Sequence, residues 1–136
     1  MSKPATQTRA RSRPLSPHLT VYRWPITMTM SILHRISGGA LYVGTLLVAW
    51  WLIALATSAD SFGLADAVLT SWFGLLVLFG FTWALMVHLL GGVRHLVWDT
   101  GAGLEKTTAS SLAWATLVGS VVLTILVWAG YFLIAG

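Results

Sequence analysis

Three long runs of apolar residues without charged side chains decide what this chain can fold into. They cover residues 36–59, 67–93 and 107–136, and the middle run contains His88. At about 1.5 Å per residue, each run can cross roughly 30 Å of hydrocarbon as a helix. We therefore predict an all-α integral membrane protein, with three transmembrane helices at about residues 29–58, 65–98 and 109–135.

The composition supports this prediction and restricts the possible chemistry. Of the 136 residues, 57% are hydrophobic and 9% are charged, which is outside the usual range for a water-soluble domain. The chain contains no cysteine, so disulfides, thiolate-bound iron–sulfur clusters and cysteine-rich zinc sites are excluded within it. Any metal that this chain binds must therefore use histidine.

The basic residues are distributed unevenly, and their distribution predicts the orientation of the helices. Six of the eight basic residues precede the first apolar run: Lys3, Arg9, Arg11, Arg13, Arg23 and Arg35. The first connecting segment carries Asp60 and Asp66 without a basic residue, whereas the second carries Arg94 and Lys106. Because cytoplasmic segments are enriched in Lys and Arg, residues 1–28 are predicted to be a cytoplasmic N-terminal segment before a transmembrane domain at 29–136.

The net charge of +4 could suggest a nucleic-acid-binding protein, but the basic residues gather at a predicted membrane boundary. We therefore expect a lipid bilayer, and no nucleic acid, as partner. The arginine-rich start without acidic residues also resembles an organelle targeting peptide. We favour a multi-pass protein of the bacterial inner membrane, with the mitochondrial inner membrane as the alternative.

His88 lies deep within the second predicted helix. It precedes the cytoplasmic end of that helix by about ten residues, which places it roughly 15 Å below the end at the helical rise. An imidazole at this depth is costly unless it bonds to a neighbouring helix, to water or to a cofactor. The depth alone leaves two interpretations open: a metal ligand, or a histidine hydrogen-bonded to a serine or carbonyl group of another helix.

The residues that follow His88 favour a haem ligand. A porphyrin needs an axial imidazole, clearance for its flat ring, and cationic or hydrogen-bonding groups for its propionates. His88, then Gly91 or Gly92, and then Arg94 with His95 provide these features in order along the second helix.

Low-spin b-type haem normally takes two axial histidines. The other histidines of the chain, His18, His34 and His95, lie near or beyond the predicted cytoplasmic boundary. We therefore expect the second axial ligand to come from another chain, and a bundle of three helices is small enough to need such a partner.

A second polar group lies at the start of the first helix. Ser31, His34 and Arg35 are separated by three and four residues, which is the spacing of side chains that share a helical face. A hydroxyl and a guanidinium can donate hydrogen bonds to a quinone carbonyl and stabilise negative charge on it. The alternative is that Arg35 reaches lipid phosphates and Ser31 caps the helix.

Two motifs go beyond these general arguments. Residues 13–37 read RPLSPHLTVYRWPITMTMSILHRIS, with Arg-Pro followed by Ser-x-x-His-Arg-x-Ser. Residues 88–101 read HLLGGVRHLVWDTG, in which a histidine is followed by a small residue, Arg-His and an aromatic-Asp pair. Both stretches resemble the motifs of the succinate dehydrogenase cytochrome b subunit, and the resemblance covers essentially the whole chain.

The resemblance implies a subunit of respiratory complex II, which oxidises succinate and passes electrons to ubiquinone. It implies three partners: a flavoprotein with FAD, an iron–sulfur subunit, and a second membrane anchor that completes the bundle and shares haem b. By matched position, His88 is expected to be the axial haem ligand. Residues expected to line the quinone site are Ser31, Ile32 and Arg35. Residues expected near the haem propionates are His34, Arg35 and His95.

Two alternatives remain open at this point. The first is the anchor of a quinol–fumarate reductase, in which electrons flow in the reverse direction. The second is a non-redox membrane transport or assembly protein, although the chain shows no internal repeat and no carboxylate at mid-membrane depth.

Overall fold

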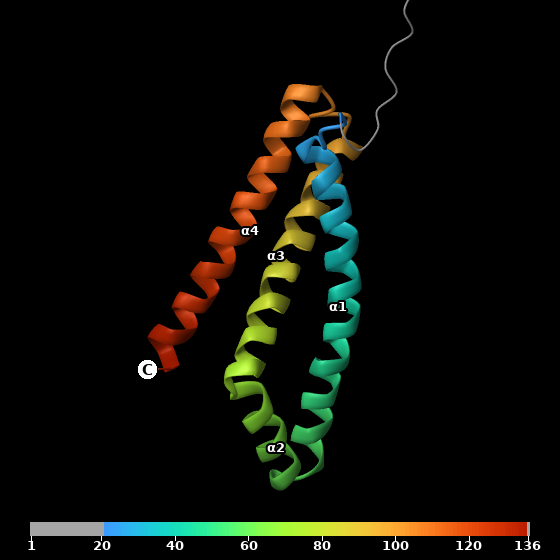
Figure 1. The fold of residues 1–136 in the computed structure, drawn as a ribbon. Helices are drawn as coiled ribbons and strands as arrows, with labels where there is room; N and C mark the ends of the chain where they lie inside the picture. Colours follow the sequence, from blue (N-terminus) through green and yellow to red (C-terminus); the bar gives the residue numbers. More distant parts are fainter. Residues whose placement is uncertain (1–20, 136) are drawn as a thin grey trace, which may run out of the picture.

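The structure, a computed structural model, describes residues 21–135. This region forms four helices, with α1 at Ile26–Thr57, α2 at Ala59–Thr70, α3 at Trp72–Asp99 and α4 at Lys106–Ala135. Figure 1 shows α3 running between α1 and α4, with the short α2 at one end of the bundle. Within the described region, α1, α3 and α4 are long and apolar enough to cross a membrane, which confirms the three predicted spans.

The expected second helix over residues 65–98 is interrupted in the structure. It is divided at Ser71 into α2 and α3. The Ser71 hydroxyl accepts a hydrogen bond from the backbone N–H of Gly74 at 3.1 Å and donates one to the carbonyl of Val68 at 2.6 Å. At Gly74, a Cβ would collide with the carbonyl oxygen of Val68. The break therefore depends on a capping serine and a glycine that lie inside an uncharged run.

The outer helices begin earlier than the apolar pattern suggests. α1 begins three residues before the expected position, directly after Pro25, whose carbonyl accepts hydrogen bonds from Met28 and Thr29 at 3.0 and 3.2 Å. α4 begins at Lys106 instead of residue 109. The extension of α4, Lys-Thr-Thr, is polar and charged, and hydropathy does not assign such a turn to a span. The extension of α1, Ile-Thr-Met, lies directly after Pro25, which sets the start of that helix.

The turn between α3 and α4 brings those two helices together. Gly101 and Gly103 have φ values of +80° and +71°, which residues with a Cβ rarely adopt. The indole N–H of Trp98 donates a hydrogen bond to the carbonyl of Gly103 at 3.2 Å. The end of α3 is thereby fixed against the start of α4.

The core lies where α1, α3 and α4 meet near the N-terminal end of α1. Its fully buried residues are Met30, Val87 and Ala113, one from each long helix. Along α4 the buried side chains include Thr116, Ser120 and Thr124, whose hydroxyls donate to carbonyls of their own helix at 2.7–2.8 Å. These small residues let α4 approach α3 without leaving polar groups unpaired.

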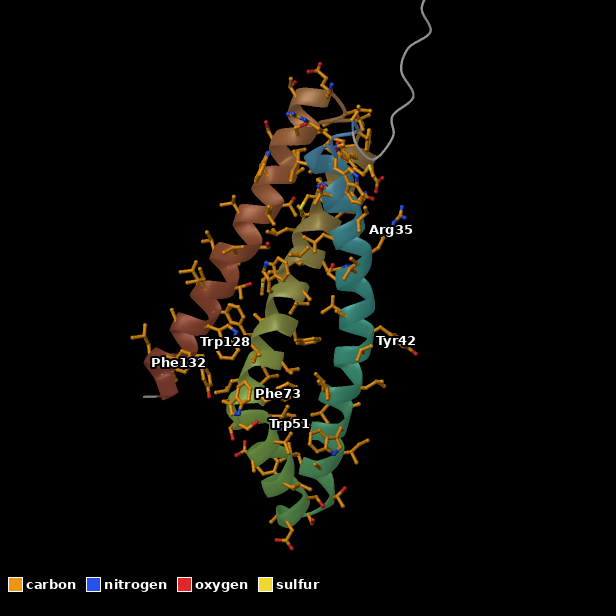
Figure 2. All side chains as sticks on the ribbon, in the orientation of Figure 1. Arg35, Tyr42, Trp51, Phe73, Trp128 and Phe132 are labelled. Atoms are coloured by element: carbon orange, nitrogen blue, oxygen red, sulfur yellow. The ribbon has the colours of Figure 1, made fainter. Side chains whose placement is uncertain are left out.

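The outer surface of the bundle is apolar. Figure 2 shows side chains projecting from all sides of the long helices, and Tyr42 on α1 is 75% exposed. In the most apolar segment of each long helix, between 11% and 17% of the residues are buried within the chain. Lipid or the helices of another protein must therefore cover most of these side chains.

Candidate functional site

Two histidines from different helices stack face to face between α1 and α3. The ring of His34 lies 4.0 Å from the ring of His88, with an angle of 6° between their planes. At the helical rise, His88 lies roughly 16 Å from the end of α3 at Asp99. The stacked pair is therefore inside a membrane-spanning part of the bundle.

The Nδ1 atom of His88 is held by α1. It lies 3.2 Å from the backbone carbonyl oxygen of His34 and 3.4 Å from the hydroxyl oxygen of Ser37. Because a carbonyl oxygen can only accept, Nδ1 of the neutral ring carries the proton and donates it to that oxygen. The lone pair then lies on Nε2, for which no hydrogen-bond partner is found among residues 21–135. His88 thus presents an oriented nitrogen in the form that binds metals.

One glycine on each helix makes room for the histidine of the other helix. A Cβ on Gly38 would lie 3.0 Å from Cε1 of His88, and a Cβ on Gly91 would collide with Nδ1 of His34. By contrast, a Cβ on Gly39 or Gly92 would meet no atom within 4 Å. Of the two glycines that the sequence offers beside His88, Gly91 packs against His34, and Gly92 borders open space.

Arg94 lies one turn and a half beyond His88 and is buried, with 3% of its surface exposed. Its Cζ atom lies 5.0 Å from the ring centroid of Trp98, within the range of a cation–π interaction. Its Nε and Nη1 atoms are buried without a hydrogen-bond partner, and no carboxylate within 21–135 pairs with it. A buried guanidinium is costly without a counter-charge, so Arg94 is suited to bind an anionic group.

His95 extends the site toward the end of α3. Its ring lies 5.4 Å from that of His34 and 5.2 Å from that of Trp98. His88, His34, His95 and Trp98 therefore form a continuous row of rings, and Arg94 lies against its last member. We refer to these five residues as the histidine site. The side chain of His95 is exposed, whereas those of His34 and His88 are half-buried.

The described residues contain no group of three or more His, Cys, Asp or Glu side chains that could enclose a metal ion. Within this part of the chain, the histidine site instead offers imidazole nitrogens without a hydrogen-bond partner, Nε2 of His88 and the buried Nδ1 of His34, together with the buried cation of Arg94 further along α3. This donor set fits a metal whose other ligands come mainly from a macrocycle, with a negatively charged periphery near Arg94.

Comparison with known proteins also points to a membrane subunit of a redox enzyme. Residues 9–127 match the family of succinate dehydrogenase/fumarate reductase transmembrane subunits. The chain is 49% identical over 121 residues to a succinate dehydrogenase cytochrome b556 subunit of Paracoccus denitrificans, covering 89% of this chain and 93% of the relative. It is 38% identical over 116 residues to the corresponding subunit of Rickettsia conorii, covering 85% and 90%.

A mitochondrial relative is also similar. The cytochrome b560 subunit of succinate dehydrogenase from Sus scrofa is 40% identical over 97 residues, covering 68% of this chain and 56% of the relative. The chain belongs to the succinate dehydrogenase/fumarate reductase transmembrane subunit family. Together with its three apolar helices, this membership makes it a multi-pass inner-membrane subunit of a complex II-type oxidoreductase.

The three residues expected to line the quinone site do not form an enclosed site within this chain. Ser31 and Ile32 are half-buried near the start of α1. Arg35 is exposed, and Figure 2 shows its side chain pointing away from the bundle. His34, expected on the same face as Ser31 and Arg35, instead points toward α3 and stacks on His88.

Two contacts of the histidine site were not anticipated from the sequence. Ser37 is 4% exposed, and its hydroxyl donates to the His34 carbonyl at 2.9 Å while approaching His88. Trp98 packs against Arg94 and His95. The available signal for Ser37 was its position one turn after His34 in the same motif.

Proposed function

We propose that this chain is the haem b-binding membrane anchor of a succinate dehydrogenase and that it contributes to the binding and reduction of ubiquinone. His88 is the axial ligand to the haem iron through Nε2. The observation that carries the proposal is the hydrogen bond from Nδ1 of His88 to the His34 carbonyl, at 3.2 Å. Metal-binding histidines usually donate their other ring N–H to such a group, which fixes the tautomer and orients the ring.

The second axial ligand comes from another chain, most simply the second membrane anchor. Two axial imidazoles bind the iron from opposite faces of the porphyrin, so their coordinating nitrogens point toward each other. The rings of His34 and His88 instead stack face to face, with their centroids 4.0 Å apart and their planes nearly parallel. His34 therefore supports His88 as a neighbour and does not serve as its opposite ligand.

Four basic side chains, two from α3 and two from α1, hold the haem carboxylates. Arg94 binds the carboxylates most strongly, because its Nε and Nη1 atoms are buried without another hydrogen-bond partner among the described residues. His95 and His34 extend the row of nitrogen donors beside it, and Arg35 reaches the same membrane level from the outer face of α1. Bound haem supplies a one-electron carrier at this position, and these side chains provide its orientation and charge balance.

The quinone site is shared with partner subunits. Ser31 and Ile32 are half-buried, and Arg35 is exposed, so they form one wall that other chains must complete. The Ser31 hydroxyl donates a hydrogen bond to the quinone carbonyl, and the Arg35 guanidinium stabilises negative charge on the reduced ring. Because a guanidinium does not deprotonate in proteins, water or partner residues deliver the two protons.

The partners in this proposal are a flavoprotein with FAD, an iron–sulfur subunit and the second anchor, with the start of α1 facing the cytoplasm. The positive charge before the first apolar run supports this orientation, and Asp60 and Asp66 belong to α2, which follows the other end of α1. The relatives cited above bear the name succinate dehydrogenase, which favours succinate oxidation over the fumarate reductase direction.

The test is to purify the complex through a tag on this chain and record a reduced-minus-oxidised optical spectrum. We expect flavin and iron–sulfur subunits to copurify, together with a b-type haem spectrum and succinate-dependent ubiquinone reduction. A preparation with these soluble partners but no haem would overturn the cytochrome assignment. A preparation without the soluble partners would favour the transport or assembly alternative.

A further inference from the structure

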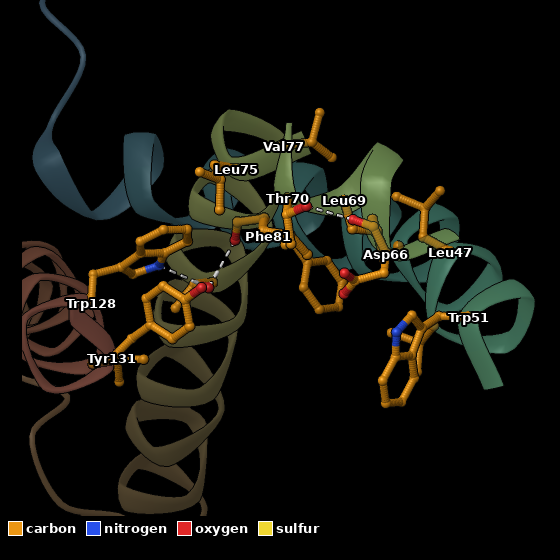
Figure 3. A pocket seen from close by; sticks show the side chains of 15 residues that line it. Leu47, Trp51, Asp66, Leu69, Thr70, Leu75, Val77, Phe81, Trp128 and Tyr131 are labelled. Carbon is orange, nitrogen blue, oxygen red and sulfur yellow. Dashed lines mark hydrogen bonds between the residues drawn. The ribbon is translucent and has the colours of Figure 1, made fainter. Parts of the chain in front are cut away.

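A cavity lies away from the histidine site, at the end of the bundle where α2 joins α3. Its volume is about 420 Å³, and all four helices contribute to its wall. Figure 3 shows Trp128 and Tyr131 of α4 on one side and Trp51 of α1 with Asp66 of α2 on the other. The cavity is therefore a feature of this chain's own fold.

The wall of the cavity is mainly apolar. Most of its lining consists of aliphatic and aromatic side chains, among them Leu47, Val48, Leu75, Leu78 and Phe81. The hydroxyl of Thr82 is already used, since it donates to the Leu78 carbonyl at 2.8 Å and accepts from Trp128 Nε1 at 3.3 Å. Thr70 likewise donates to the carbonyl of Asp66 at 2.7 Å. These two hydroxyls therefore have little capacity left for a polar ligand, and the rest of the wall is mainly apolar, so the occupant is apolar over most of its length.

The volume distinguishes a narrow chain from a helix. A helix with its side chains is about 10–12 Å wide and rises about 5.4 Å per turn, so roughly one turn would occupy the entire cavity. A transmembrane helix of a partner needs several turns in contact, which this cavity cannot accept. A flexible hydrocarbon chain can enter between the helices and fill it.

The charge at the mouth of the cavity determines which polar head group the hydrocarbon chain can carry. The wall contains one acidic residue, Asp66, and its side chain is exposed. A carboxylate there repels anionic lipid phosphates and attracts an ammonium group. Asp60 lies on the same helix but outside the wall of the cavity.

We propose that this cavity is a structural lipid site that takes one acyl chain of a zwitterionic, ammonium-bearing phospholipid, with the ammonium group near Asp66. The lipid lies against α3, with the wall residues of α1 and α4 on either side of it. Figure 1 shows α3 between α1 and α4. This inference is independent of haem and quinone binding, because none of the residues in the wall belongs to the histidine site or to the proposed quinone wall.

The experiment uses the whole purified complex, washed with detergent and analysed by native mass spectrometry. Phosphatidylethanolamine, phosphatidylglycerol and ubiquinone are each added back to separate samples. Val48→Trp fills the cavity, whereas Val43→Trp places the same side chain on α1 outside the wall, at a position that is 60% exposed. We expect phosphatidylethanolamine to bind to the parent complex and to the Val43→Trp complex, and to be lost from the Val48→Trp complex.

A second pair of variants tests the head group. Asp66→Asn should reduce the preference for phosphatidylethanolamine over phosphatidylglycerol by about fivefold, the usual effect of one charge at a membrane surface. Asp60→Asn, on the same helix but outside the wall, should leave that preference unchanged. Equal loss of lipid in Val48→Trp and Val43→Trp, a site that takes ubiquinone in preference to phospholipid, or a parent complex that binds none of the three, would each overturn the proposal.

Discussion

The imidazole rings of His34 and His88 lie parallel with their centroids 4.0 Å apart, although 54 positions separate the two residues in the chain. The same two residues are joined again by the hydrogen bond from His88 Nδ1 to the His34 carbonyl, at 3.2 Å. α1 therefore orients the His88 ring through both its backbone and a side chain. The nitrogen left available is Nε2, and its reactivity depends on the residues that hold the ring.

Ser37→Ala should weaken haem binding without removing it. The variant loses the hydroxyl that lies 3.4 Å from His88 Nδ1, while the His34 carbonyl still accepts from that atom. Loss of such a supporting contact costs about 10- to 100-fold in metal affinity, and we expect the lower end because one acceptor remains. The measurement is the rate at which the purified complex loses haem to an excess of a haem-acceptor protein.

The matched control for Ser37→Ala is Thr45→Ala. Thr45 also lies on α1, and its hydroxyl donates to a carbonyl three residues earlier, that of Tyr42, at 2.6 Å. It is exposed and makes no contact with His88. If both variants lose haem at the same increased rate, the effect of Ser37 is a general effect on α1, and the supporting role is contradicted.

Gly38→Ala should reduce the haem content of the complex, whereas Gly39→Ala should not. A Cβ at residue 38 would lie 3.0 Å from His88 Cε1 and would push the ring out of its orientation, while a Cβ at residue 39 would meet nothing within 4 Å. Both positions lie in the same helix, so the change in helix propensity is the same. The haem-to-flavin ratio of the two purified complexes provides the comparison, and equal ratios would mean that close packing at Gly38 does not orient His88.

Arg94→Gln should lower the haem reduction potential. Removing a positive charge beside the cofactor stabilises the oxidised, more positive iron relative to the reduced form, and we expect a shift on the order of tens of millivolts. The measurement is a potentiometric titration of the haem absorbance in the complex. Arg35→Gln provides a contrast, since Arg35 is exposed and Arg94 is 3% exposed. A larger shift in Arg35→Gln than in Arg94→Gln would contradict the role of the buried guanidinium.

The transmembrane fold could be predicted because uncharged runs of sufficient length have few alternatives in a bilayer. The three spans follow from this rule, and α1, α3 and α4 confirm them. The division at Ser71 could not be predicted in the same way. It lies inside an uncharged run, where hydropathy is uniform, and it depends on capping by Ser71 and on close packing at Gly74.

Features of the candidate site that depend on one helix could be predicted from the sequence. Features that depend on how two helices pack against each other could not. The depth of His88 follows from its position within a single span. Its contacts with His34 and Ser37 depend on how α1 packs against α3, which local periodicity does not encode. The burial of Arg94 was missed for the same reason, because a basic residue near the end of a span is more often exposed at the membrane surface.

Ser31→Ala and Arg35→Ala should impair ubiquinone reduction while leaving haem in place. Each variant removes a hydrogen-bond donor from the proposed quinone wall, which typically costs about 1.5–3 kcal/mol for a charged donor and less for a neutral hydroxyl. We therefore expect at least about a tenfold loss in kcat/KM for ubiquinone in Arg35→Ala. Succinate oxidation with an artificial electron acceptor serves as the control and should stay unchanged. Normal ubiquinone kinetics in both variants would remove the quinone site from α1.

The most direct test of the central claim is a cryo-electron-microscopy map of the assembled complex at a resolution that separates the His88 ring from its neighbours. The account predicts a macrocycle whose iron lies within bonding distance of His88 Nε2, with Nδ1 still facing the His34 carbonyl and a second imidazole from another chain on the opposite side. A map in which the His88 ring contacts only protein, with no macrocycle beside Nε2, would contradict the account.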